Sequence, residues 1–189
     1  MKKLLIALGM FLGVIFSVSV ASASLRQDAI NSNNPDDLVE YLDTTKSGKS
    51  LNIAKVKYTS NNYLVLVFKN KPKIKSESQR ERLAANFQHV INSVPKSFVK
   101  SGIAFFNGNS DGANMIIAFS NKKIGKGNYY STVKDDSLKD FSQGATAFYI
   151  EPSFSEQSDG LISSDPDTQG PKSGPDDETL IEVIQDAVE

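Results

Sequence analysis

"SESQRERLAANFQHVINSVPKSF", residues 76–98, is the stretch on which the fold of this chain depends. Its apolar residues recur at the three- and four-residue spacing of one helix face and span an arc of about 100°. Ser76 or Ser78 together with Glu81 resembles a helix-capping pattern, and Pro95 is expected to end or kink the helix. The sequence predicts a long amphipathic helix whose buried face is formed by Leu83, Phe87, Val90, Ile91, Val94 and Phe98.

The segments before this helix predict a β-hairpin. "YLVLVF", residues 63–68, is apolar on both faces, which is typical of a central strand. "LNIAKVKY", residues 51–58, is the preceding strand, and "TSNN", residues 59–62, supplies a turn because asparagine tolerates left-handed backbone angles. A first helix is predicted over Ser32–Asp43, upstream of the hairpin.

Three more strands are predicted after the long helix. "GIAFF" at 102–106 and "NMIIAF" at 114–119 are apolar runs, and "NGNSDG" at 107–112 joins them with turn-forming residues. "ATAFYIEP", residues 145–152, predicts a last strand that Pro152 stops. A short helix is predicted over Asp135–Phe141.

This order predicts an α+β fold: an antiparallel four- to five-stranded sheet with the main helix packed on one face, in two layers. We assign the domain to residues 24–154, a disordered acidic linker to 155–177 and an amphipathic helix to 178–189. The charge is divided in the same way. Leu25–Ile150 holds 18 basic against 11 acidic residues, whereas Glu151–Glu189 holds one base against 11 acids.

The first 23 residues have the organisation of a secretory signal peptide. Lys2 and Lys3 precede the apolar run Leu4–Val20, and small residues follow, with cleavage expected near Ala23. The alternative is an uncleaved membrane anchor. The chain has no cysteine, so disulfides and thiolate metal sites are excluded. These features favour a bacterial protein that is secreted or associated with the cell wall.

The sequence gives little support for catalysis. His89 is the only histidine and falls about 150° from the centre of the apolar helix face, so it is expected to face solvent. Arg82, Asn86 and Ser93 share its side of the helix and form no base–nucleophile pair. Phosphate-loop, dinucleotide-binding and nucleophile-elbow motifs are absent from the sequence. No cofactor is expected.

Lysine is concentrated in and beside the hairpin. Alternate residues of an extended chain share a side, so the lysines of "KNKPKIK", residues 69–75, are expected to line one sheet edge. Such a patch would bind a polyanion or an acidic partner; the alternative is that the lysines protect the edge from aggregation. Aromatic residues are not interleaved, which disfavours nucleic acid. The candidate binding residues are Lys55, Lys57, Lys69, Lys71, Lys73 and Lys75.

Oxygen-bearing residues near the C-terminus have the spacing of an EF-hand calcium loop. Asp165, Asp167, Gln169 and Asp176 occupy the first, third, fifth and twelfth positions. Lys172 at the eighth position and the short side chain at the twelfth do not fit this pattern. A disordered Asp/Pro/Gly linker is the alternative interpretation.

The last residues predict a helix with one apolar and one acidic side. A free helix of twelve residues is marginal in water, so its apolar side should be buried against its own domain, another copy or a partner's groove. The acidic side disfavours anionic membranes. One hypothesis is that this tail folds over the lysines and masks them. The candidate contact residues are Leu180, Ile181, Ile184 and Val188.

These patterns predict a secreted, non-catalytic protein that binds a protein or an anionic cell-surface polymer through its lysine-rich edge and its tail helix. No specific nucleic-acid binding and no membrane span after signal cleavage are expected. The alternatives are a cell-envelope hydrolase, or an inhibitor or immunity-type protein of an exported enzyme.

Overall fold

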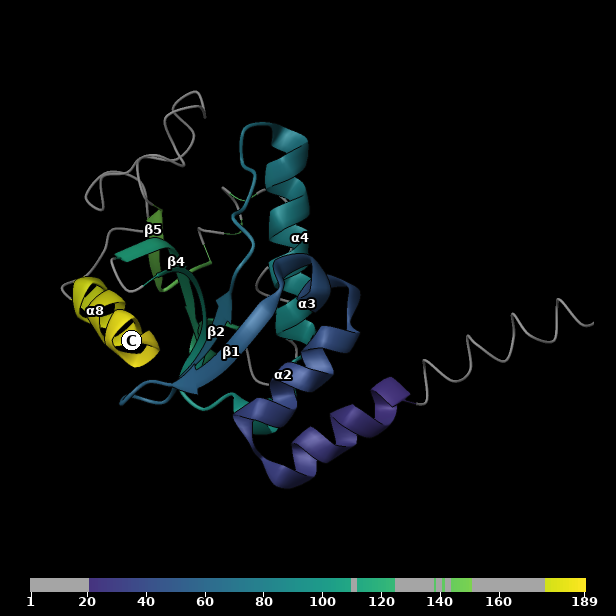
Figure 1. Ribbon diagram of the computed structural model, residues 1–189. Helices are drawn as coiled ribbons and strands as arrows, with labels where there is room; N and C mark the ends of the chain where they lie inside the picture. Colours follow the sequence, from purple (N-terminus) through teal and green to yellow (C-terminus); the bar gives the residue numbers. More distant parts are fainter. Residues whose placement is uncertain (1–20, 110–111, 125–137, 139–140, 142–143, 151–175) are drawn as a thin grey trace, which may run out of the picture.

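The structure is a computed structural model that describes residues 21–109, 112–124, 138, 141, 144–150 and 176–189 (Figure 1). Residues 21–32 are helical. The elements that follow are α2 (Pro35–Thr44), α3 (Lys46–Leu51), β1 (Ile53–Tyr58), β2 (Tyr63–Phe68), α4 (Glu77–Ser93), the 3-10 helix η1 (Lys96–Phe98), β3 (Gly102–Asn109), β4 (Gly112–Ser120), α5 (Asn121–Ile124), β5 (Ala147–Ile150) and α8 (Asp176–Val188).

The five strands form one mixed sheet in the order β1-β2-β3-β4-β5. The pairs β1–β2, β3–β4 and β4–β5 are antiparallel, whereas β2 pairs with β3 in parallel. The predicted α+β class is confirmed, but a wholly antiparallel sheet is wrong. The reason is the connection through α4: a helix that packs on the sheet returns the chain to the end at which β2 began, so β3 runs alongside β2.

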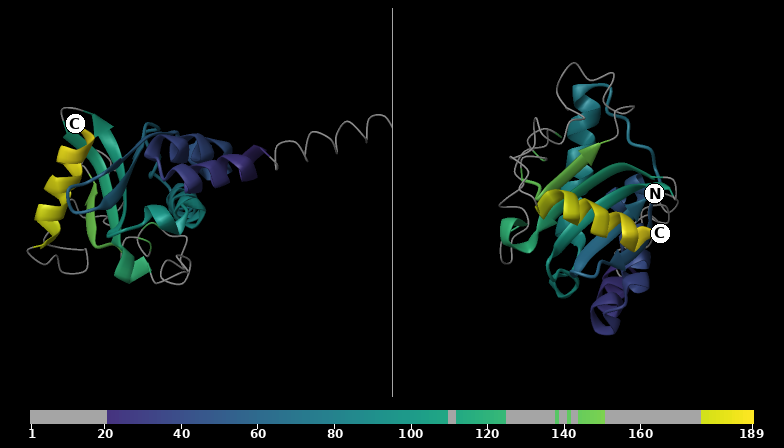
Figure 2. Two further views of the ribbon diagram at one scale, coloured as in Figure 1. Left: turned by 90° about the horizontal axis from the view of Figure 1, so that it is seen from below. Right: turned by 90° about the vertical axis from the view of Figure 1, so that its left-hand side faces the viewer.

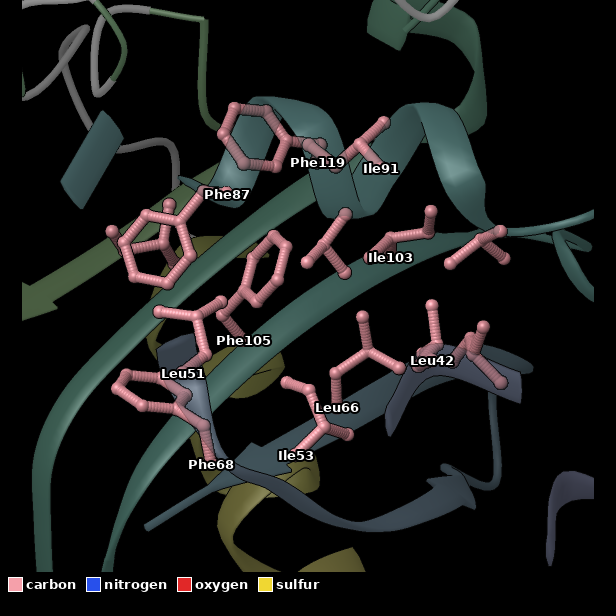
Figure 3. Packing of buried hydrophobic residues seen from close by; sticks show 14 of the residues in the cluster. Leu42, Leu51, Ile53, Leu66, Phe68, Phe87, Ile91, Ile103, Phe105 and Phe119 are labelled. Carbon is pink, nitrogen blue, oxygen red and sulfur yellow. The ribbon is translucent and has the colours of Figure 1, made fainter. Parts of the chain in front are cut away.

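The main core lies between this sheet and the helices before β3. The apolar face predicted for residues 76–98 is buried, although the helix ends at Ser93 and residues 96–98 form η1. Phe87 packs on Phe68 and Phe105, with ring centroids 5.6 and 4.5 Å apart (Figure 3). Aromatic pairs at this spacing stabilise a core beyond the area that they bury. Helix α4 therefore holds β2 and β3 together from one side.

Helix α8 packs on the opposite face of the sheet (Figure 2). Leu180 and Ile184 are buried among β-strand residues that include Val65, Phe106 and Ile116. The sheet is thus covered on both faces, and the predicted two layers become three. The tail residues account for the difference, because β2, β3 and β4 are apolar on both faces and need a second cover.

The local structure differs from the sequence prediction in two places. Residues 46–51, for which no helix was predicted and of which Leu51 was assigned to the first strand, form α3, whose start is capped by Thr45 Oγ1 accepting from the Gly48 N–H at 3.0 Å. A bulge between Ile53 and Lys55 shifts the β1 register, so Ile53 and Val56 both enter the main core. The predicted left-handed asparagine of the first turn is confirmed at Asn62, with φ 65°.

Candidate anion-binding site

Residues 69–75 form the crossover segment, which leads from β2 to α4 and carries four of the predicted lysines. Ile74 is buried in the main core, whereas Lys69, Lys71, Lys73 and Lys75 are exposed. Because Ile74 points into the core, its neighbours Lys73 and Lys75 face the solvent. The segment is not a sheet edge: β2 is an internal strand, and the edge strands are β1 and β5.

Hydrogen bonds from side chains fix the backbone of the crossover segment. The buried amide of Asn107 donates to the Phe68 carbonyl at 2.7 Å. Asn70 donates through its side chain to the Ser50 carbonyl at 2.6 Å. At the other end, Arg80 Nη1 donates to the Ile74 carbonyl at 3.2 Å. Both ends of this short connection are therefore held in place, which limits the entropy that its lysines lose on binding a ligand.

A pocket of about 510 Å³ lies between the crossover segment, α3 and α4, and we call it the crossover pocket. Two lysines and one arginine reach its wall, and no carboxylate side chain of the described residues does. Three amides, one serine, two leucines and one proline complete its described lining. Its lining residues are Ser50, Leu51, Asn70, Lys71, Pro72, Lys73, Gln79, Arg82, Leu83 and Asn86.

The amides of the crossover pocket are held by hydrogen bonds. Gln79 Oε1 accepts from the Lys75 backbone N–H at 3.1 Å, and Asn86 donates to Ser50 Oγ at 3.0 Å. The neighbouring carboxylate of Glu77 pairs with Arg80 at 2.8 Å, the only ion pair among the described residues. Glu77, at the start of α4, is therefore engaged by an arginine that is not among the described lining residues of the pocket.

Lys55 and Lys57 lie elsewhere, on the edge strand β1. Lys55 lines a separate groove of about 460 Å³ beside α8, together with Asp186, Val188 and Glu189. Hydrogen bonding with Lys55, followed by desolvation and repulsion from the same ammonium group, lowers the pKa of Lys57. The two side chains are thus close neighbours. Of the six predicted lysines, the structure brings together Lys71 and Lys73 in the crossover pocket, and Lys55 and Lys57 on β1.

The predicted contact residues of the tail lie on the protein's own sheet. Leu180 and Ile184 are buried, and Ile181 and Val188 are half-buried around them. Among the described residues of the tail, α8 shares a groove with Lys55 and lines no part of the crossover pocket. The masking hypothesis for the tail helix is therefore confined to Lys55.

The predicted calcium ligands fall mostly outside the described residues. This holds for Asp165, Asp167 and Gln169, while Asp176 is the first residue of α8. Within the part of the chain that the structure describes, no group of three or more acidic or histidine side chains is placed to hold a metal ion.

The sequence analysis missed three residues of the crossover pocket. Gln79, Arg82 and Asn86 recur at three- and four-residue spacing on the solvent side of α4. That spacing places them on one helix face, so the sequence contained a signal that they act together. Ser50 carried no such signal, because its position depends on α3, which was not predicted.

His89 is exposed, as expected from the helix pattern. Ser93 Oγ donates to the His89 backbone carbonyl at 2.8 Å, so this serine is hydrogen-bonded to the helix backbone. The two residues share the side of α4 that faces away from the core.

Within the described segments, no helix combines the length and apolar character needed to cross a membrane. A scan against protein-family models finds no match for this chain. A search of curated proteins and a search of solved structures likewise find no match.

Proposed function

We propose that this chain is an exported, non-catalytic binding protein that holds an anionic group of its ligand in the crossover pocket. The observation that carries the proposal is the composition of the pocket wall. Lys71, Lys73 and Arg82 face a space that, within the described segments of the chain, no carboxylate side chain lines.

The wall has the chemistry that oxyanions require. The planar guanidinium of Arg82 can donate two parallel hydrogen bonds to a phosphate, carboxylate or sulfate group, and the lysines add point charges. The volume of about 510 Å³ lies within the range of small-ligand pockets. One anionic group and the unit attached to it would therefore fit.

Binding is favoured over catalysis by the same wall. Its described lining residues include no histidine, tyrosine or carboxylate that could act as a general base. Its one hydroxyl, on Ser50, accepts a hydrogen bond from Asn86. The site offers charge and hydrogen bonds without a proton acceptor beside a nucleophile.

Export is proposed from the signal-peptide pattern of residues 1–23, and the expected ligands are an anionic cell-surface polymer or an acidic protein. Expression of the full chain in a bacterial host should deliver a shortened form to the medium. Intact chain retained inside the cell would contradict this part of the proposal.

Charge removal in the crossover pocket tests its function. We expect the triple variant Lys71→Gln, Lys73→Gln and Arg82→Gln to lose at least tenfold of its affinity for tripolyphosphate, measured by titration calorimetry. The matched control Arg26→Gln, Lys55→Gln and Lys57→Gln removes the same formal charge outside the pocket. Equal losses in the two variants would show that only net charge matters and would refute the site.

A further inference from the structure

We infer that the ligand is a flexible phosphate polymer that starts in the crossover pocket, runs along α4 and ends in a second cationic pocket. This inference rests on the proposed function of the crossover pocket and extends it to the size and chemistry of the ligand.

The second pocket has a volume of about 480 Å³ and lies where β2 and β3 begin and β4 ends. Lys100 and Lys122 are exposed at its wall, and none of the described carboxylate side chains lines it. Asn121 donates through its side chain to the Lys100 carbonyl at 3.1 Å. Lys100 Nζ also lies 4.5 Å from the centroid of the Tyr58 ring. The backbone and the ammonium group of Lys100 are thus both positioned.

The two pockets lie at opposite ends of β2. Tyr63, at the start of the strand, lines the second pocket, and Asn70, just after its end, lines the crossover pocket. A strand rises about 3.3 Å per residue, so the pockets are roughly 20 Å apart. A single small anion cannot reach both, whereas a polymer with repeated charges can.

Along the chain, helix α4 lies between the residues of the crossover pocket and those of the second pocket. The chain enters α4 from the crossover segment and leaves it through η1 toward Lys100 and β3. At 100° per residue, Arg82, Asn86, His89 and Ser93 fall within an arc of about 60° on the side away from the core. These four residues form a polar stripe along α4, and exposed Lys96 follows in η1.

The polar stripe is free of acids within helix α4. The helix has two carboxylates, and Glu77 is paired with Arg80. Glu81 lies about 100° around the helix from Arg82. A chain of negative charges could therefore follow α4 from one pocket to the other without passing directly over a carboxylate of that helix.

The composition of the stripe distinguishes a phosphate polymer from other polyanions. Protein partners usually bury aromatic or aliphatic anchors, and the four stripe residues are all polar. Single-stranded nucleic acids stack successive bases on aromatic side chains, and the stripe has one such ring, the imidazole of His89, and no phenylalanine, tyrosine or tryptophan. Repeated phosphates need only charge and hydrogen bonds, which this surface supplies.

Two double variants, each with two lysines replaced by glutamine, test the inference in the full chain. We expect Lys100→Gln with Lys122→Gln to weaken binding of long-chain polyphosphate about tenfold or more, because the second contact of one polymer is lost. The slope of log affinity against log salt should become less steep by about 1.4, the value for two phosphate contacts on a single-stranded polyanion. Lys55→Gln with Lys57→Gln is the matched control and should leave both quantities nearly unchanged.

Tripolyphosphate separates this inference from the proposed function. It should still shift the amide NMR signals of Arg82 and Asn86 in the Lys100/Lys122 variant, because the crossover pocket is intact. Suppose that those shifts persist while the two double variants weaken binding of long-chain polyphosphate equally. The path along α4 is then refuted, and the crossover pocket stands. If tripolyphosphate causes no such shifts in the native chain, the proposed function itself fails. Tighter binding of poly-glutamate than of polyphosphate would overturn the assigned ligand class.

Discussion

At the scale of single residues, a buried amide connects the sheet to the binding surface. Asn107 lies on β3 but hydrogen-bonds to the Phe68 carbonyl, where the crossover segment begins. Its Oδ1 accepts from Asn114 Nδ2 at 3.3 Å, so both the nitrogen and the oxygen of this amide are hydrogen-bonded. Buried polar groups of this kind are costly to leave unpaired. Asn107 therefore acts as a positioning residue for the lysines that follow Phe68.

Replacing Asn107 by leucine should destabilise the protein by about 1–3 kcal/mol, because the Phe68 carbonyl would lose its buried donor. Urea unfolding followed by circular dichroism measures this change. The exposed Asn92→Leu variant on α4 is the control and should stay within about 0.5 kcal/mol of the native chain. Asn107→Leu should also weaken tripolyphosphate binding; unchanged affinity would show that Asn107 does not position the crossover segment.

Lys55 and Lys57 allow a test of local electrostatics on β1. Replacing Lys55 by methionine should raise the pKa of Lys57 toward the ordinary lysine value, because the neighbouring hydrogen-bonding cation is removed. A pH titration of the Lys57 Cε signal by NMR would show the shift. The same titration in Lys69→Met should give the native Lys57 curve.

The sign of the accompanying stability change follows from the lowered pKa of Lys57. The folded chain releases this proton more readily than the unfolded chain, so the stabilising contribution is complete above the ordinary lysine pKa. It is lost as the pH falls through the folded value. A native chain that gained stability from this pair on acidification in that range would contradict the assignment.

At the scale of elements, local periodicity predicted the strands and the helices α2, α4 and α8, but it predicted neither α3 nor all of the pairing. The apolar faces of α4 and α8 were readable because helix spacing is a local property. The parallel β2–β3 pair depends on residues about 40 positions apart, and periodicity carries no information on direction. The bulge near Lys55 was likewise invisible, because it appears only when β1 is paired with β2.

The contribution of α8 can be measured through its central buried side chain. Ile184→Ala should destabilise the packing of α8 by about 2–5 kcal/mol, the range for removing a fully buried branched side chain. Hydrogen exchange should then accelerate in α8 and much less in α4, which packs on the other face. Exposed Glu182→Ala is the control. Equal acceleration in both helices would mean that the three layers unfold as one unit.

At the scale of the whole molecule, α8 and α4 lie on different sides of the sheet (Figure 2), and α4 is one of the elements that line the crossover pocket. The sequence identified the lysines of the crossover segment but grouped them with those of β1. The sequence pattern could not separate the lysines of residues 69–75 from Lys55 and Lys57, because their separation in space depends on the tertiary fold. From the sequence, Arg82 was placed only on the same helix face as His89. Its position in the pocket lining depends on the course of residues 69–75, which the sequence pattern does not predict.

Removing residues 176–189 should leave tripolyphosphate binding in the crossover pocket within about twofold of the native value, because α8 lines no part of that pocket. The truncated chain should bind a hydrophobic dye and self-associate, because Val65, Phe106 and Ile116 lose their cover. Calorimetry and analytical ultracentrifugation would measure these two effects. Retained hydrogen-exchange protection of α4 would establish that the rest is folded. An affinity gain above tenfold would instead show that the tail masks the crossover pocket.

The late position of α8 in the sequence has a consequence for biosynthesis. A ribosome releases the chain from its N-terminus, so all five strands emerge before α8, which ends about 40 residues after β5. At 5–20 residues per second this delay is about 2–8 s. During that interval the face of the sheet that α8 will cover is nonpolar and exposed to water. Chaperone capture, or sticking between nascent copies, should be concentrated in this brief stage of the protein's life.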